Sequence, residues 1–136
     1  AATTALPAVR VAMRQRELPT DPVGWLVLRI PIGTVWSEET LYRGALLTVA
    51  QDAFGPVIGN LLQASTFGLS HIVDARGSGE SVAGTVLVTG AAGWVFGRLT
   101  ARTGSLLAPA LAHLAINEAG AVAAMVLQRR ISRWST

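Results

Sequence analysis

The sequence predicts an all-α fold, a polytopic membrane bundle of about four transmembrane helices. Hydrophobic residues make up 51% of the 136 residues and charged residues only 14%, whereas a soluble domain usually carries about 25% charge. The mean hydropathy is +0.46. Because so few polar side chains cannot cover a water-facing globule, the composition favours a chain that faces lipid.

The first apolar run extends from residue 23 to about residue 50. It is longer than the roughly 20 residues that span the hydrocarbon core. We expect the helix to begin at Asp21-Pro22, since aspartate caps a helix and proline suits the first helical position. Pro31 and Gly33 interrupt the run and predict a kink there, in a tilted or broken helix.

Three further spans follow, over residues 57–73, 82–99 and 106–127. The segments between consecutive spans are Gly55-Pro56, the polar glycine-bearing loop 74–80, and Thr103-Gly104. Gly93 and Gly97 in the third span form the small-xxx-small pattern that lets helix backbones approach closely, and we expect a packing role for them.

The basic residues predict an orientation. All eleven are arginine, which is typical of a GC-rich genome and suggests a bacterial source. Seven lie on one side of the predicted spans: Arg10, Arg14, Arg16, Arg76, Arg129, Arg130 and Arg133. Only Arg98 and Arg102 lie on the other side. By the positive-inside rule, we expect both termini of this segment in the cytoplasm. We expect the chain to be an integral multi-pass protein of the bacterial plasma membrane.

Several partners and sites are excluded. The arginines are scattered rather than gathered on one stripe, which argues against a nucleic-acid partner. The chain has no cysteine, so disulfides and thiolate metal sites are absent. It begins at Ala1 without a charged-then-apolar leader, and we expect it to be a piece of a longer protein.

Two adjacent carboxylates and an arginine lie inside the first span. Ionised groups at such a place cost several kcal/mol unless they find partners or water. Glu39 and Arg43 are spaced i, i+4 and can pair along one helix face. Glu38 points roughly 100° away from Glu39 around the helix axis, so its side chain must face a different neighbour from the one that Glu39 faces.

The same four-residue spacing recurs in the second and fourth spans. Phe67 precedes His71, and His113 precedes Asn117. Each pair lies on one face of its helix. Three helices can therefore direct a carboxylate, two imidazoles and an amide into one shared interior.

These motifs resemble those of the CAAX protease and bacteriocin-processing family of intramembrane endopeptidases, also called the Abi family. Glu-Glu-x-x-x-Arg begins at residue 38, Phe-x-x-x-His at residue 67 and His-x-x-x-Asn at residue 113, in the family order and on separate spans. Tyr42 stands where many members have phenylalanine. The resemblance covers about residues 23–128. It divides the chain into a polar N-terminal segment (1–21), a protease core (22–130) and a C-terminal tail (131–136).

The resemblance implies hydrolysis of a peptide bond in a membrane-associated protein or peptide substrate. Glu38 would be the general base that activates water together with His71. His113 and Asn117 would hold the developing oxyanion.

Further residues would support this site. The resemblance makes Glu39 and Arg43 an orienting ion pair and Phe67 a wall of the cavity. Eukaryotic relatives remove the last three residues of prenylated proteins, and bacterial relatives are tied to bacteriocin maturation and self-immunity. A bacterial source argues against prenylated substrates.

Two descriptions of water activation stay open. The family is often classed with metalloproteases, and Glu38, His71 and His113 could hold Zn²⁺ with a fourth position free for water. The spacing does not match the His-Glu-x-x-His signature of zinc proteases, and a metal-free Glu–His activation fits the same residues.

Two other function classes also stay open. A non-catalytic membrane scaffold or bacteriocin-immunity protein would keep the fold and bind a partner. An ion or proton transporter would use the same buried groups as a relay. The polar residues could also have a purely structural role, as an ion pair and as side chains that join helices. This explanation leaves Glu38 without a partner and must explain the polar residues of three helices separately.

The depth of His71 is a difficulty for a shared site. Straight helices place it about five residues from the end of its span, whereas Glu38 and His113 lie nearer mid-membrane, a mismatch on the order of 10 Å. Tilt, the break near Pro31, or extension of the second span into residues 74–77 would remove it.

Overall fold

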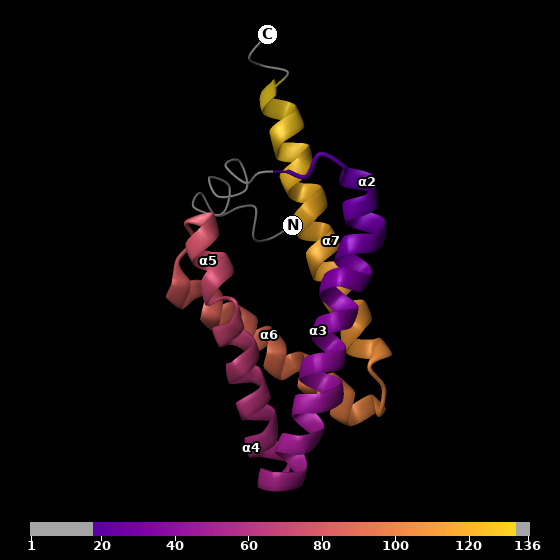
Figure 1. The fold of residues 1–136 in the computed structure, drawn as a ribbon, viewed down its shortest axis with the longest axis vertical. Coiled ribbons are helices and arrows are strands. Elements are labelled where there is room, and N and C mark those ends of the chain that lie inside the picture. Colours follow the sequence, from indigo (N-terminus) through magenta and orange to yellow (C-terminus); the bar gives the residue numbers. More distant parts are fainter. Residues whose placement is uncertain (1–17, 133–136) are drawn as a thin grey trace.

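The computed structural model describes residues 18–132, and within this range the backbone is helical and contains no β-strand (Figure 1). Residues 1–17 and 133–136 lie outside the described residues. The predicted polar N-terminal segment and tail are therefore described only at residues 18–21 and 131–132. The predicted orientation stays a prediction, because it depends partly on arginines outside the described range.

Within the described residues, three helical segments are long and apolar enough to cross a membrane: Pro22–Ser78, Val82–Thr103 and Leu107–Arg129. Large apolar side chains on them face outward, and Val27, Val73 and Leu87 are each more than 70% exposed. Soluble monomers rarely expose such continuous apolar surface. The predicted all-α membrane bundle is confirmed.

The first segment makes two passes. A straight helix of its 57 residues would be about 85 Å long, far more than the roughly 30 Å hydrocarbon core. The chain reverses at Gly55, whose φ of 79° and ψ of 170° suit glycine, and Pro56 follows. Figure 1 shows the two resulting limbs side by side. With the other two helices they make four passes, as the sequence predicts.

The first limb consists of consecutive helical turns: α2 (Pro22–Gly24), η2 (Trp25–Trp36), α3 (Ser37–Glu39), η3 (Thr40–Leu46) and the first part of α4 (Leu47–Ser70). Its start is as predicted, because the Gly24 amide donates to Asp21 Oδ1 at 2.9 Å and Pro22 occupies the first turn. Asp21 therefore caps the helix.

Of the two alternatives predicted near Pro31 and Gly33, a tilted or a broken helix, the broken helix is wrong. The helix continues without interruption through both residues as η2, a π-helix that contains Pro31. At its end the Ser37 amide donates both to the carbonyl of Ile32, five residues earlier, and to that of Thr34. Proline lacks an N–H and its ring crowds the carbonyl four residues before it. A wider π turn accommodates both effects without a break.

The second limb is longer than predicted. It runs along α4 from Pro56, passes His71, and continues as α5 (Ile72–Ser78), so most of the predicted loop 74–80 is helical. Gly79, with φ of 70°, ends α5 in the left-handed conformation that glycine adopts readily at a helix C-terminus. This extension carries the helix beyond His71 and is one of the expected ways to remove its depth mismatch.

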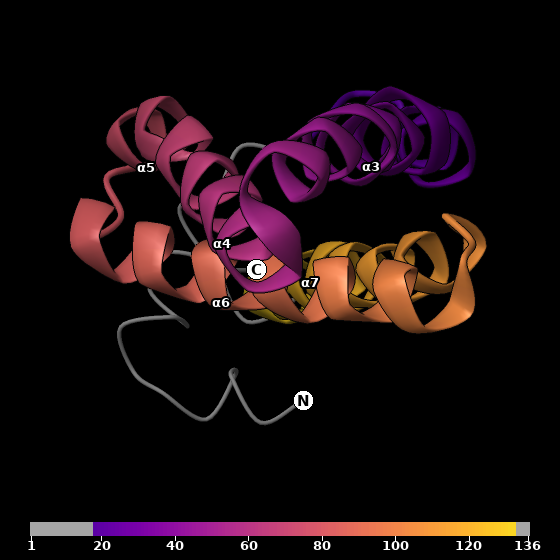
Figure 2. The same ribbon diagram turned by 90° about the horizontal axis from the view of Figure 1, so that it is seen from below.

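The remaining helices are α6 (Val82–Thr103) and α7 (Leu107–Ser132). Ser81 caps α6 by accepting from the Gly84 amide at 3.2 Å. Gly104, with φ of 63°, makes the predicted turn before α7. Seen along the bundle, the two limbs of the first segment form one layer and α6 and α7 form the other (Figure 2).

The helices α4 and α6 pack most closely of all. A Cβ on Gly93 would lie 2.9 Å from the Phe67 ring, and one on Gly97 would collide with the Asn60 side chain. Gln63 Nε2 donates to the Gly93 carbonyl at 3.0 Å. The predicted packing role of the two glycines is confirmed.

Gly68→Ala is expected to lower the free energy of unfolding by about 1–3 kcal/mol. A Cβ there would lie 2.6 Å from the Val86 carbonyl oxygen, and backbone cannot move aside as a side chain does. The measurement is denaturant unfolding in detergent micelles. Gly120→Ala is the control, since a Cβ there meets nothing within 4 Å and alanine favours a helix. Equal stability of the two variants would contradict this packing.

Candidate functional site

The carboxylate of Glu39 is the centre of a buried network. Its Oε1 accepts a hydrogen bond from Arg43 Nη1 at 3.0 Å and lies 2.8 Å from His113 Nδ1. The side chains of Glu39 and Arg43 are both 0% exposed. The predicted i, i+4 pair is thus present, and a histidine from α7 joins it.

The imidazole of His113 lies between the two adjacent glutamates. Its Nδ1 contacts Glu39, and its Nε2 lies 3.8 Å from Glu38 Oε2. The ring stacks on Phe96 of α6 at 5.1 Å between centroids and meets Phe67 of α4 edge-to-face at 5.9 Å. Side chains from the other three passes therefore orient this one ring.

Phe67 occupies the middle of the site. Its ring centroid lies 4.2 Å from the Arg43 guanidinium carbon and 4.8 Å from the His71 ring. Tyr42 packs edge-to-face on it at 5.0 Å. A cation over an aromatic face is attracted to the ring, so Phe67 both supports Arg43 and separates the two histidines.

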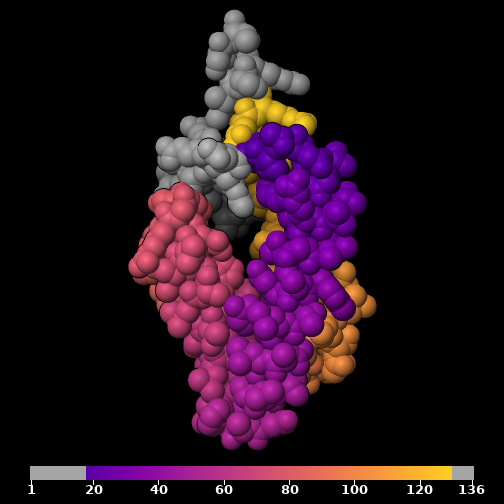
Figure 3. Space-filling view, in the orientation of Figure 1, coloured from indigo at the N-terminus to yellow at the C-terminus, as the bar shows by residue number. Residues whose placement is uncertain are grey.

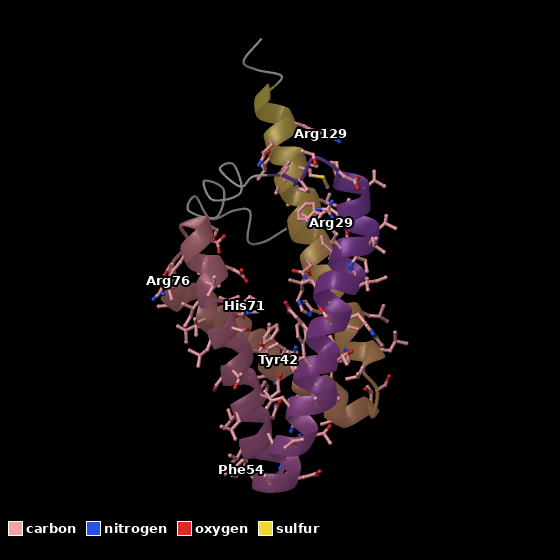
Figure 4. All side chains as sticks on the ribbon, viewed as in Figure 1. Arg29, Tyr42, Phe54, His71, Arg76 and Arg129 are labelled. Atoms are coloured by element: carbon pink, nitrogen blue, oxygen red, sulfur yellow. The ribbon has the colours of Figure 1, made fainter. Side chains whose placement is uncertain are left out.

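His71 lies at the junction of α4 and α5 and is half-buried. Its Nδ1 lies 2.8 Å from the Phe67 carbonyl oxygen. A carbonyl only accepts hydrogen bonds, so Nδ1 carries the proton and Nε2 is left as an acceptor. The imidazole lies within electrostatic range of the Glu38 carboxylate. In Figure 4, His71 and Tyr42 lie on the facing sides of the two limbs.

Five buried polar atoms of the site have no hydrogen-bond partner among residues 18–129: Glu38 Oε2, Glu39 Oε2, Arg43 Nε, Arg43 Nη2 and Asn117 Nδ2. Asn117 follows His113 by one turn of α7. A buried polar atom without a partner costs about 1–3 kcal/mol. Such atoms in a site indicate that water or substrate completes their hydrogen bonding.

The space-filling view shows a hollow between α5 and the first limb, with α7 behind it (Figure 3). A separate apolar groove of about 440 Å³ lies between α4 and α6 and is lined by residues such as Leu61, Val86 and Trp94. That groove contains none of the polar residues of the site.

The geometry does not fit the zinc site that Glu38, His71 and His113 could have formed. In the described part of the chain, no three side chains of the metal-ligating types come together at one point. No reaction step is therefore derived through a metal.

Two site residues were not found from the sequence. Phe96 stacks on His113, and Tyr42 packs on Phe67. A signal for Phe96 was present, because it lies between Gly93 and Gly97 on the face of α6 that packs closely against α4. The contact between Glu39 and His113 had no such signal.

Comparison with known proteins places the chain in a family. The family model described as type II CAAX prenyl endopeptidase Rce1-like matches residues 20–119, a range that includes all three motifs. No curated protein and no solved structure matches the chain. Since the family model covers most of the sequence, the chain belongs to the Rce1-like family of type II CAAX prenyl endopeptidases.

Proposed function

We propose that this chain hydrolyses a peptide bond of a membrane-associated protein or peptide through water held by Glu38 and His71. One observation carries the proposal most directly: the buried, unpaired Oε2 of Glu38 lies 3.8 Å from His113 Nε2, inside a network formed by all four passes. The family is a family of proteases, which supports hydrolysis as the reaction.

Glu38 serves as the general base. Its carboxylate takes one proton as the water oxygen bonds to the carbonyl carbon of the substrate, and the π electrons of the carbonyl move to its oxygen. His71 Nε2, free to accept, orients the same water through its second hydrogen. General base catalysis of this kind contributes about 10²- to 10⁴-fold in rate.

The oxyanion formed in this step needs donors. Asn117 Nδ2 is a buried N–H donor with no partner in the described part of the chain, and it lies on the same face of α7 as His113. Each preorganised donor of this kind lowers the barrier by about 3–4 kcal/mol. His113 Nε2 becomes a second donor when it carries a proton.

The test is cleavage by the purified protein in liposomes. Internally quenched peptides with a lipid anchor are incubated with the proteoliposomes, and products are identified by mass spectrometry. A protease releases a defined fragment. A scaffold or immunity protein releases none, and a transporter moves ions or protons across the same vesicles without cleaving peptide; either result would contradict the proposal.

A further inference from the structure

We propose that Glu39 holds His113 as the tautomer protonated at Nδ1, so that His113 first accepts a proton from Glu38 and only then donates it to the substrate. This makes Glu39 a positioning residue and His113 a proton carrier. The inference rests on the proposed function, but its central measurement does not depend on peptide cleavage.

The contacts of Glu39 determine the tautomer. Arg43 keeps its charge in proteins, and its Nη1 donates to Glu39 Oε1 at 3.0 Å. This favours the ionised carboxylate, which can only accept hydrogen bonds. His113 Nδ1 lies 2.8 Å from the same oxygen, so Nδ1 must carry the hydrogen.

The tautomer also determines the state of the other ring nitrogen, Nε2 of His113. A neutral imidazole has one N–H, and with Nδ1 protonated its Nε2 has only a lone pair. That lone pair faces Glu38 Oε2 at 3.8 Å. In this state His113 cannot donate to an oxyanion, so a donor role requires a second proton.

Glu38 is the group placed to supply that proton. Its Oε2 has no hydrogen-bond partner in the described range. The 3.8 Å separation is longer than a hydrogen bond, but catalytic contacts are often long before substrate binds and shorten in the complex. The rings of Phe96 and Phe67 keep His113 from turning away.

The proton balance is complete with these groups alone. Glu38 takes a proton from the attacking water and passes it to His113 Nε2, which becomes an imidazolium beside ionised Glu39. Its Nε2–H donates to the oxyanion and then transfers the proton to the leaving nitrogen as the C–N bond breaks. The electron pair of that bond stays on nitrogen, the amine departs, and His113 is neutral again. The new carboxylic acid loses its proton to solvent.

The first test is ¹⁵N NMR of the wild-type protein in detergent at neutral pH, labelled at histidine. The chain has only two histidines, so the His71→Gln variant assigns both sets of resonances. We expect neutral His113 protonated at Nδ1. Protonation at Nε2 would overturn the proposal, whether or not any peptide is cleaved.

The second test is Glu39→Gln, compared with wild type in both kinetics and NMR. An amide can donate to Nδ1 and release the tautomer, so we expect a mixture of tautomers and a kcat lower by on the order of 10²- to 10⁴-fold with KM nearly unchanged. A variant that loses activity but keeps the wild-type tautomer would show that Glu39 has only a structural role. If the variant does not fold, the wild-type spectrum still decides.

Discussion

Glu38→Gln is expected to lower kcat for peptide cleavage by on the order of 10²- to 10⁴-fold while leaving the fold intact. The amide has nearly the same shape as the carboxylate but cannot take a proton from water. Folding should not depend on the charge, because Glu38 Oε2 has no hydrogen-bond partner among residues 18–129 and the side chain is 28% exposed. The measurements are steady-state cleavage in proteoliposomes and thermal unfolding in detergent.

The matched control is Glu80→Gln. It is the same chemical change at an exposed position, where the carboxylate has, among the residues that the structure describes, only a 3.5 Å contact with Thr85 Oγ1. Its cleavage rate should equal that of wild type. If Glu38→Gln cleaved peptide at the wild-type rate, Glu38 could not be the general base. A partner-binding phenotype that survives in Glu38→Gln would instead support the scaffold.

Arg43→Met is expected to destabilise the protein by about 3–5 kcal/mol, the usual cost of removing one partner of a buried ion pair. Arg43 is 1% exposed and is the only cation that contacts Glu39 in the described part of the chain, apart from His113 when protonated. Without Arg43, the Glu39 carboxylate stays buried and loses most of the favourable charge interaction that offsets the cost of its burial. The measurement is the free energy of unfolding from denaturant titration in micelles.

The double variant Glu39→Gln/Arg43→Met separates the charge from the packing. Replacing both charges with neutral side chains of similar size is often close to neutral for stability. We therefore expect the double variant to regain a large part of the stability lost by Arg43→Met. If the two variants are equally unstable, the stacking of Arg43 on Phe67 and Phe96 rather than its charge is what matters.

The start of the first helix and two of the turns could be predicted closely from local sequence, whereas the end of the second span could not. Asp21-Pro22, Gly55-Pro56 and Gly104 mark ends and turns, because capping, the missing proline N–H and positive φ are properties of one or two residues. The predicted break near Pro31 failed for a different reason. Proline removes a hydrogen bond, but the sequence does not show whether the helix ends there or widens, since that depends on packing along the whole limb.

The candidate site could likewise be predicted only in part, because some of its contacts lie within one helix and others join different helices. Spacing by itself determined that Glu39 can pair with Arg43, that Phe67 and His71 share a face, and that His113 and Asn117 share another. These contacts lie within one helix, where the geometry is constant. Only the tertiary structure decided that Glu39 also binds His113, 74 residues away, and that Phe96 stacks on that imidazole. Contacts between helices depend on how each helix is rotated and how deeply it lies, and close packing at residues such as Gly68 and Gly93 sets both.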